Sequence, residues 1–140
     1  MQDINIDDFY KDMATTLLSL YQQFPRKISL YVEDICGPDE VDEFGLHSKR
    51  YLSCIGAVMW LLDEGYIRYT DIAHQESVED CTLTQKGFSK LIKPSLIDTT
   101  GGESNSIEKQ RSTLAHQMYA AIQAHSSIAI KELIETHIMV

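Results

Sequence analysis

Two stretches of this chain, WLLDEGYIRY at Trp60–Tyr69 and CTLTQKGFSKL at Cys81–Leu91, determine the fold that we expect. In the first, Gly65 follows an apolar run and supplies the left-handed conformation that commonly ends a helix. In the second, Thr84 stands before a short helical pattern as a good N-cap. The chain is therefore expected to leave a long helix, form extended structure, and enter a short helix.

The same stretches predict a pair of strands over residues 66–72 and 78–83, joined by a loop at 73–77. Ile67 and Leu83 are expected to face the core from these paired strands. Together the motifs resemble the third helix, the wing and the following helix of MarR- and PadR-like winged helix-turn-helix proteins. The resemblance covers about residues 25–92. It implies a mainly α, α+β fold with a two-stranded wing, flanked by an N-terminal helix and C-terminal helices.

Upstream of these motifs lies the most apolar segment, in which only Ser53 and Gly56 among residues 51–62 are not hydrophobic. A helix from Ser48 to Glu64 is expected here, buried on more than one face. Gly56 is expected to let a neighbouring element approach closely. Earlier in the chain, the pattern predicts a helix ending at Phe24 before Pro25 and a short helix over Asp39–Phe44 closed by Gly45. Between them, the alternation over 27–32 predicts a short strand, and an entry turn to a helix is the alternative.

The chain divides into a winged-helix domain at 1–94, a linker at 95–106 and a C-terminal helical tail at 107–140, which Ser126–Ser127 divides into two helices. The apolar positions of the first helix and of the tail exceed what one small winged-helix core needs. We therefore expect the terminal helices to form a homodimer. The sequence leaves open the alternative that the tail folds back on its own domain.

The composition of the chain indicates its cellular compartment and whether it crosses a membrane. No apolar run reaches the roughly 18–20 residues that a membrane span needs, and the first residues, MQDINIDDFY, are acidic rather than a basic signal region. Cys36, Cys54 and Cys81 form no CxxC pair, so free thiols in a reducing compartment are expected. The chain is therefore expected to be cytoplasmic, without contact to a membrane.

By the resemblance, the helix that starts at Ser48 occupies the position that reads the major groove of DNA. Its first turns then supply the side chains that contact bases, and basic residues near the wing contact phosphates. The candidate nucleic-acid-binding residues are Ser48, Lys49, Arg50, Ser53, Arg68 and Lys86.

Charge placement departs from the pattern of DNA-binding members. The formal net charge is −9, whereas nucleic-acid binders gain affinity when Lys and Arg replace counterions on phosphate. The segment 31–46 contains no Lys or Arg, and neither does the wing at 69–85, which carries Asp71, Glu76, Glu79 and Asp80. The acidic stripe that we expect to bind a partner comprises Glu33, Asp34, Asp39, Glu40, Asp42 and Glu43.

No motif indicates an enzyme, a cofactor or a metal. Cys54 has His47 nearby but lies in the most apolar helix, where a thiol is packing rather than a nucleophile. His74 is near Glu76 and Asp80 in the wing loop, where carboxylates are usually solvated. The acidic stripe lacks the alternating spacing of a calcium loop. We therefore expect no catalytic residues, no cofactor and no metal.

Two functions remain. The first is a non-catalytic protein-interaction module that docks on a basic partner as a subunit or adaptor of a larger assembly, by analogy with the kite subunits of bacterial condensin-like complexes. The second is a dimeric transcriptional regulator that places the Ser48–Glu64 helix in the major groove. Charge placement favours the first.

Overall fold

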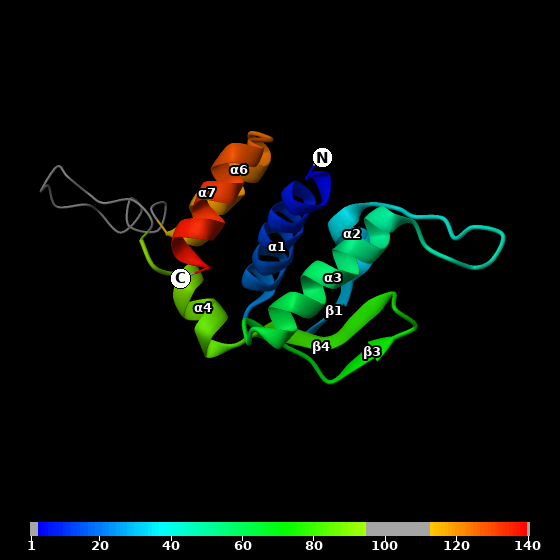
Figure 1. The fold of residues 1–140 in the computed structure, drawn as a ribbon. Coiled ribbons are helices and arrows are strands. Elements are labelled where there is room, and N and C mark those ends of the chain that lie inside the picture. Colours follow the sequence, from blue (N-terminus) through cyan, green and yellow to red (C-terminus); the bar gives the residue numbers. More distant parts are fainter. Residues whose placement is uncertain (1–2, 95–112, 140) are drawn as a thin grey trace, which may run out of the picture.

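The computed structural model describes residues 3–94 and 113–139. Within these ranges the chain is an α+β protein, with helices packed around a small antiparallel sheet (Figure 1). Within the described residues the predicted sequence of helix, strand, helix, helix, hairpin and helix is present, although the second helix lies elsewhere than predicted and the first wing strand is divided. The elements are α1 (Ile4–Gln23), β1 (Ile28–Tyr31), α2 (Val32–Cys36), α3 (Lys49–Asp63), β2 (Ile67–Arg68), β3 (Asp71–Ala73), β4 (Ser77–Leu83), α4 (Gln85–Leu91), α6 (Leu114–Gln123) and α7 (Ser127–His137).

The sheet is built on β4, which pairs antiparallel with β1, β2 and β3. Ile67 lies opposite Leu83, and both are buried, which confirms the predicted pair. The strand predicted over 66–72 is instead two short strands, β2 and β3. Asp80 on the facing strand has a φ of 50°, a left-handed conformation that interrupts regular pairing.

Both ends of α3 form as predicted. The Ser48 hydroxyl accepts the amide of Tyr51 at the N-terminus, and Gly65 has a φ of 79° just after the C-terminus. The Thr84 hydroxyl caps α4 by accepting the amide of Gly87.

The helix predicted over 39–44 is wrong. The helical turn in this region is α2, which comes earlier, directly after β1, and buries Val32 and Ile35. Gly37, with a φ of 94°, ends it. In the segment that follows, the side chains of Asp39 and Asp42 accept backbone amides, and such local bonds compete with helix formation.

The predicted close approach at Gly56 is also wrong, because a Cβ at this position would meet nothing within 4 Å. The close approach is at Gly87 in α4, where a Cβ would collide with the carbonyl oxygen of Tyr66. The apolar character of α3 therefore does not mean that all its sides are buried, since Leu52 is 52% exposed.

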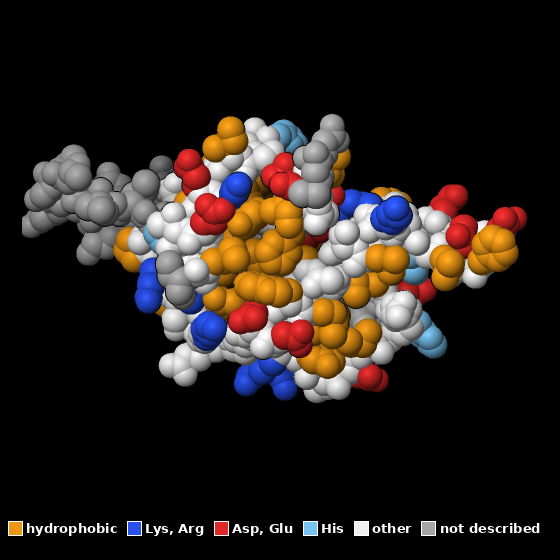
Figure 2. Space-filling view, viewed as in Figure 1, with side chains coloured by type: hydrophobic (Ala, Val, Ile, Leu, Met, Phe, Trp, Pro, Cys, Tyr) orange, Lys and Arg blue, Asp and Glu red, His pale blue; other side chains and the backbone are white. Residues whose placement is uncertain are grey.

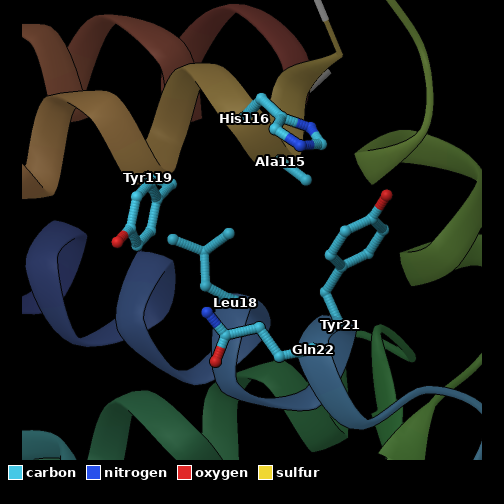
Figure 3. Close-up of a pocket in the computed structure, with 6 residues that line it drawn as sticks. All are labelled: Leu18, Tyr21, Gln22, Ala115, His116 and Tyr119. Atoms are coloured by element: carbon cyan, nitrogen blue, oxygen red, sulfur yellow. The ribbon is translucent and has the colours of Figure 1, made fainter. Parts of the chain in front are cut away.

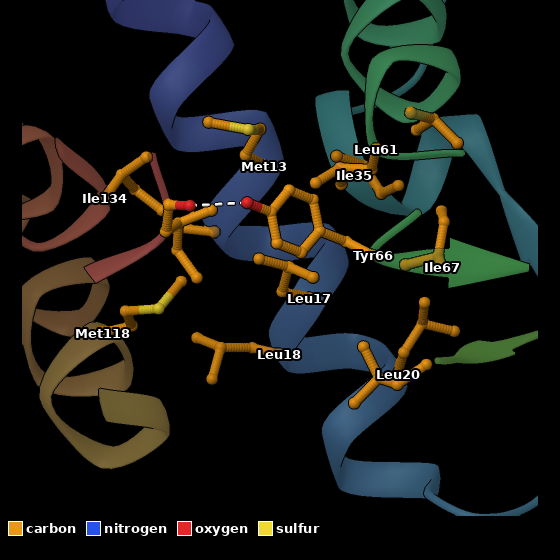
Figure 4. Packing of buried hydrophobic residues seen from close by; sticks show 14 of the residues in the cluster. Met13, Leu17, Leu18, Leu20, Ile35, Leu61, Tyr66, Ile67, Met118 and Ile134 are labelled. Atoms are coloured by element: carbon orange, nitrogen blue, oxygen red, sulfur yellow. Dashed lines mark hydrogen bonds between the residues drawn. The ribbon is translucent and has the colours of Figure 1, made fainter. Parts of the chain in front are cut away.

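The C-terminal helices α6 and α7 pack against α1 and belong to the same core as the rest of the chain (Figure 4). The Tyr66 hydroxyl donates to the carbonyl of Ile138, and the Tyr10 hydroxyl donates to Glu135. The tail residues buried in this core are Leu114, Ala115, Met118, Ala121, Ile130, Ile134 and Ile138.

The alternative left open by the sequence, a tail folded on its own domain, is therefore the one observed. The apolar surplus on which the homodimer prediction rested is used within one chain, and homodimerisation itself stays a prediction. None of the described helices is long and apolar enough to cross a membrane.

Candidate functional site

The loop between α2 and α3, residues 37–48, is anchored at its base by Asp39. The carboxylate of Asp39 accepts the hydroxyl and the amide of Ser48 and pairs with Nδ1 of His47 at 2.9 Å. The hydrogen bond from Ser48 is the main cause of the lowered pKa of Asp39, and the hydrogen bond from His47 adds to it. The His47 ring stacks on Tyr51, whose hydroxyl donates to the Gln75 carbonyl in the turn between β3 and β4. The loop, α3 and the hairpin are thus connected.

The tip of this loop is a tight turn that holds apolar side chains in solvent. The Asp42 carboxylate accepts the amides of Phe44 and Leu46, each at 2.9 Å, and Gly45 has a φ of 75°. Phe44 is 78% exposed, Leu46 62% and Val41 52%. In Figure 2 these hydrophobic side chains form the projection beside Asp and Glu side chains. We call residues 37–48 the acidic loop.

The acidic stripe predicted from the sequence separates into two groups. Asp39 and Asp42 are engaged in the fold of the loop, and Glu33 accepts the amide of Asp39 at 3.4 Å. The carboxylates of the second group are exposed and make no hydrogen bond or ion pair with any residue the structure describes. This group is Asp34, Glu40 and Glu43.

Arg50, a candidate for base contact, faces into the molecule. Its guanidinium donates to both oxygens of Asp12 at 2.7 and 2.6 Å, and its Nε lies 3.7 Å from Asp8. Asp12 is fully buried in α1, so this bidentate pair neutralises a carboxylate that has no access to solvent. The same hydrogen bonds raise the pKa of Arg50.

The remaining nucleic-acid candidates do not form one patch. Ser48 is engaged as a helix cap, Ser53 is half-buried, and Lys49 is exposed at the first residue of α3. Lys86 lies at the other end of that helix, where it donates to the carbonyl of Glu64 and sits over the Tyr66 ring. A helix of this length spans roughly 22 Å. Arg68 is exposed on β2, after the same C-terminal end of the helix.

The middle of the outward face of α3, between Lys49 and Asp63, is apolar where a DNA-reading helix would be polar. Leu52, Gly56 and Met59 follow one another at helical spacing, so they share this face. Beside it, a groove of about 350 Å³ runs between α3 and the β3–β4 hairpin. Figure 2 shows hydrophobic side chains over both elements. The groove is lined by Val32, Ile55, Val58, Met59, Ile72, Gln75, Ser77 and Val78.

A second hollow, of about 220 Å³, lies between α1 and α6 (Figure 3). It is lined by Leu18, Tyr21, Gln22, Ala115, His116 and Tyr119, without a carboxylate or a cysteine. The imidazole of His116 is 2.8 Å from the hydroxyl of Thr113.

The side chains considered for catalysis make no hydrogen bond or ion pair with one another within the described residues. Cys54 is fully buried, and its burial raises its pKa; burial raises the pKa of Cys81 to about 12. His47 bonds to Asp39 rather than to Cys54. Asp80 accepts the hydroxyl of Thr70, and in the described ranges no contact joins it to His74. No group of three or more His, Cys, Asp or Glu in residues 3–94 and 113–139 could hold a metal ion.

Sequence reasoning missed the apolar part of this surface. Val41, Phe44 and Leu46 stand among the acidic residues in the printed sequence, and α3 has more apolar positions than a helix with one buried face needs. These were the available signals. Comparison of the chain with protein-family models, with curated proteins and with solved structures found no significant match.

Proposed function

We propose that this protein is a non-catalytic interaction module that docks on a basic partner protein, as a subunit or adaptor of a larger assembly. The observation that carries the proposal is the acidic loop. It presents Val41, Phe44 and Leu46 to solvent next to the exposed carboxylates of Glu40 and Glu43, which make no hydrogen bond or ion pair within residues 3–94 and 113–139.

The arrangement has the two properties that protein interfaces combine. Burying an exposed side chain such as Phe44 contributes about 1.5–3 kcal/mol, and carboxylates around it select a partner of opposite charge. The hydrogen bonds of Asp39 and Asp42 hold the turn in one shape before binding. Binding therefore costs less conformational entropy than it would for a loose segment.

The positions of the basic residues also support the proposal. Arg50 neutralises buried Asp12, and Lys86 neutralises the C-terminus of α3. Both side chains are thus used by the fold. The hairpin contributes further negative charge. Glu79 on β4 accepts hydrogen bonds from the hydroxyls of Ser29 and Ser77, and these bonds lower its pKa and favour its ionised form.

DNA binding as a dimeric regulator is the second candidate. The order of elements favours it, since α3 stands where the winged-helix resemblance places the recognition helix, with Lys49 exposed at its start. The acidic loop adjoins that same helix end and would face phosphate with like charge. We rank it below protein interaction.

We further propose a cytoplasmic setting. Cys36, Cys54 and Cys81 are free thiols, the state that a reducing compartment maintains.

The test is a quantitative pull-down from cells that express the protein naturally. The triple variant Asp34→Lys/Glu40→Lys/Glu43→Lys changes only carboxylates that the fold leaves free, and it should release at least nine-tenths of the specific partner. Asp3→Lys/Asp7→Lys/Glu132→Lys is the matched control, because it reverses three exposed carboxylates away from the acidic loop and α3. It should retain the partner. Equal recovery with both triple variants would show that the acidic loop is not the docking site.

A further inference from the structure

The groove between α3 and the β3–β4 hairpin has an apolar lining that can receive the apolar face of a helix. Val32, Val58 and Val78 in its lining are buried, while Ile55 and Met59 are half-exposed and form the wall on α3. Gln75 and Ser77 are the polar residues of the lining. Such a surface holds apolar side chains, with few polar groups to fix a small polar ligand.

Gly56 makes room for a partner backbone beside this groove. It is exposed in the middle of α3, and a Cβ there would meet nothing within 4 Å. Leu52 precedes it by four residues and Met59 follows it by three, so α3 presents a notch between two apolar side chains. Gaps of this kind receive the side-chain ridge of a packed helix.

The charges around the groove define the chemistry of its occupant. Asp63 ends α3 four residues after Met59 of the lining, and Glu76 follows Gln75 of the lining in the turn of the hairpin. The free carboxylates of the acidic loop adjoin the other end of the helix. The basic residues closest to this helix in the sequence are Lys49 at its start and Arg68 on β2 after its end, since Arg50 is paired with Asp12. A second copy of this chain would bring like charge to this surface.

We propose that this groove binds an amphipathic helix of a partner protein, with apolar side chains at spacings of three and four residues and Lys or Arg on its flanks. The inference rests on the proposed interaction function and adds a second contact to that of the acidic loop. The apolar face of the partner helix fills the groove over Gly56, and its basic flanks meet the surrounding carboxylates.

The experiment is a selection from a displayed library of helical peptides in which one face is randomised. The purified full-length protein is the target, and Gly56→Arg serves for counter-selection. Gly56→Arg fills the notch with a side chain and a positive charge, at an exposed position where arginine favours the helix. Leu52→Glu is the second variant, and Gln123→Arg on exposed α6 is the control for added charge.

We expect enriched peptides with the apolar spacing and an excess of Lys and Arg. Their affinity should fall at least tenfold for Gly56→Arg and Leu52→Glu and stay unchanged for Gln123→Arg. Amide NMR shifts should locate them at Ile55, Met59 and Ile72. Enrichment of neutral or acidic peptides, equal binding to Gly56→Arg, or no enrichment would overturn the proposal. So would sedimentation showing a dimer that Gly56→Arg dissociates, because the occupant would then be a second copy.

The two proposals can fail separately. Gly56→Arg in the pull-down described above should release the partner. If the triple carboxylate variant releases it and Gly56→Arg does not, the interaction function stands and the groove is not its site.

Discussion

The contact between Arg50 and Asp12 joins residues that are 38 positions apart in sequence. No local pattern connects them, so the sequence suggested an exposed basic residue at the start of a helix. Arg50 is paired rather than free because the carboxylate of Asp12, buried in α1, needs a charged partner, and the guanidinium of Arg50 in α3 is within reach. The sequence is limited in the same way at Gly56 and Gly87. Only the fold shows that a side chain at Gly56 would have space and that one at Gly87 would collide with Tyr66.

Arg50→Ala should lower the free energy of unfolding by about 2–4 kcal/mol, because it leaves the Asp12 carboxylate buried without its partner. We expect a loss in the lower part of the range usual for breaking a buried ion pair, because the Arg50 side chain is 32% exposed. Urea unfolding measures the effect. In Asp12→Asn/Arg50→Ala the loss should be smaller than the sum of the two single losses. Lys49→Ala is the control. If Lys49→Ala and Arg50→Ala lowered the free energy of unfolding equally, the pairing of Arg50 with Asp12 would not be what stabilises the fold.

Gly87→Ala should destabilise the protein by about 1–3 kcal/mol, because the new methyl group collides with the backbone of Tyr66. Gly56→Ala makes the same chemical change in open space and should stabilise it by up to about 1 kcal/mol. Thermal unfolding of both variants gives the comparison. If both changes shift the midpoint in the same direction, the packing described for these two helices is incorrect.

At the scale of elements, the sequence was most informative where local chemistry decides the outcome. Ser48, Gly65 and Thr84 cap or end helices as predicted, because each needs only its own neighbours along the chain. The predicted helix at 39–44 failed because Asp39 and Asp42 bond to backbone amides instead. The division of the acidic stripe into structural and free carboxylates follows from those bonds, and it could not be seen in the spacing of the residues.

The anchor of the acidic loop should depend on pH. The pKa of Asp39 is lowered in the folded protein, so its contribution to stability is present above the unfolded pKa of about 3.9 and is lost as pH falls through the folded value. The amide signal of Ser48 should therefore shift below about pH 4. The amide of Gly87, which is bonded to the Thr84 hydroxyl, is the control. In Asp39→Asn the Ser48 signal should no longer follow this titration, and a titration that persisted would assign it to another group.

At the scale of the whole molecule, the C-terminal helices complete the core that α1 begins (Figure 1). The sequence showed a surplus of apolar positions at both ends of the chain but could not show whether they meet within one molecule or between two. Apolar side chains remain exposed outside this core at several places, two of which are the acidic loop and the outward face of α3. We propose that both serve the same partner.

Ile134→Ala in α7 should destabilise the monomer by about 2–5 kcal/mol, because Ile134 is fully buried against the rest of the core. Ile128, 75% exposed on the same helix, supplies the control, and Ile128→Ala should change stability by less than about 0.5 kcal/mol. The unfolding midpoint of the wild type should not depend on protein concentration. A midpoint that rises with concentration would show that association, rather than the intramolecular core, stabilises these helices.

We propose that α3 and the acidic loop form a protein-binding surface rather than a DNA-reading one. The most direct test is a fluorescence anisotropy titration of labelled random-sequence duplex DNA with the full-length protein at low salt. We expect no saturable binding, because carboxylates of the acidic loop and the hairpin lie near the helix that would enter the major groove of DNA. Binding that weakens steeply with added salt and is lost in Lys49→Ala/Arg68→Ala would contradict it.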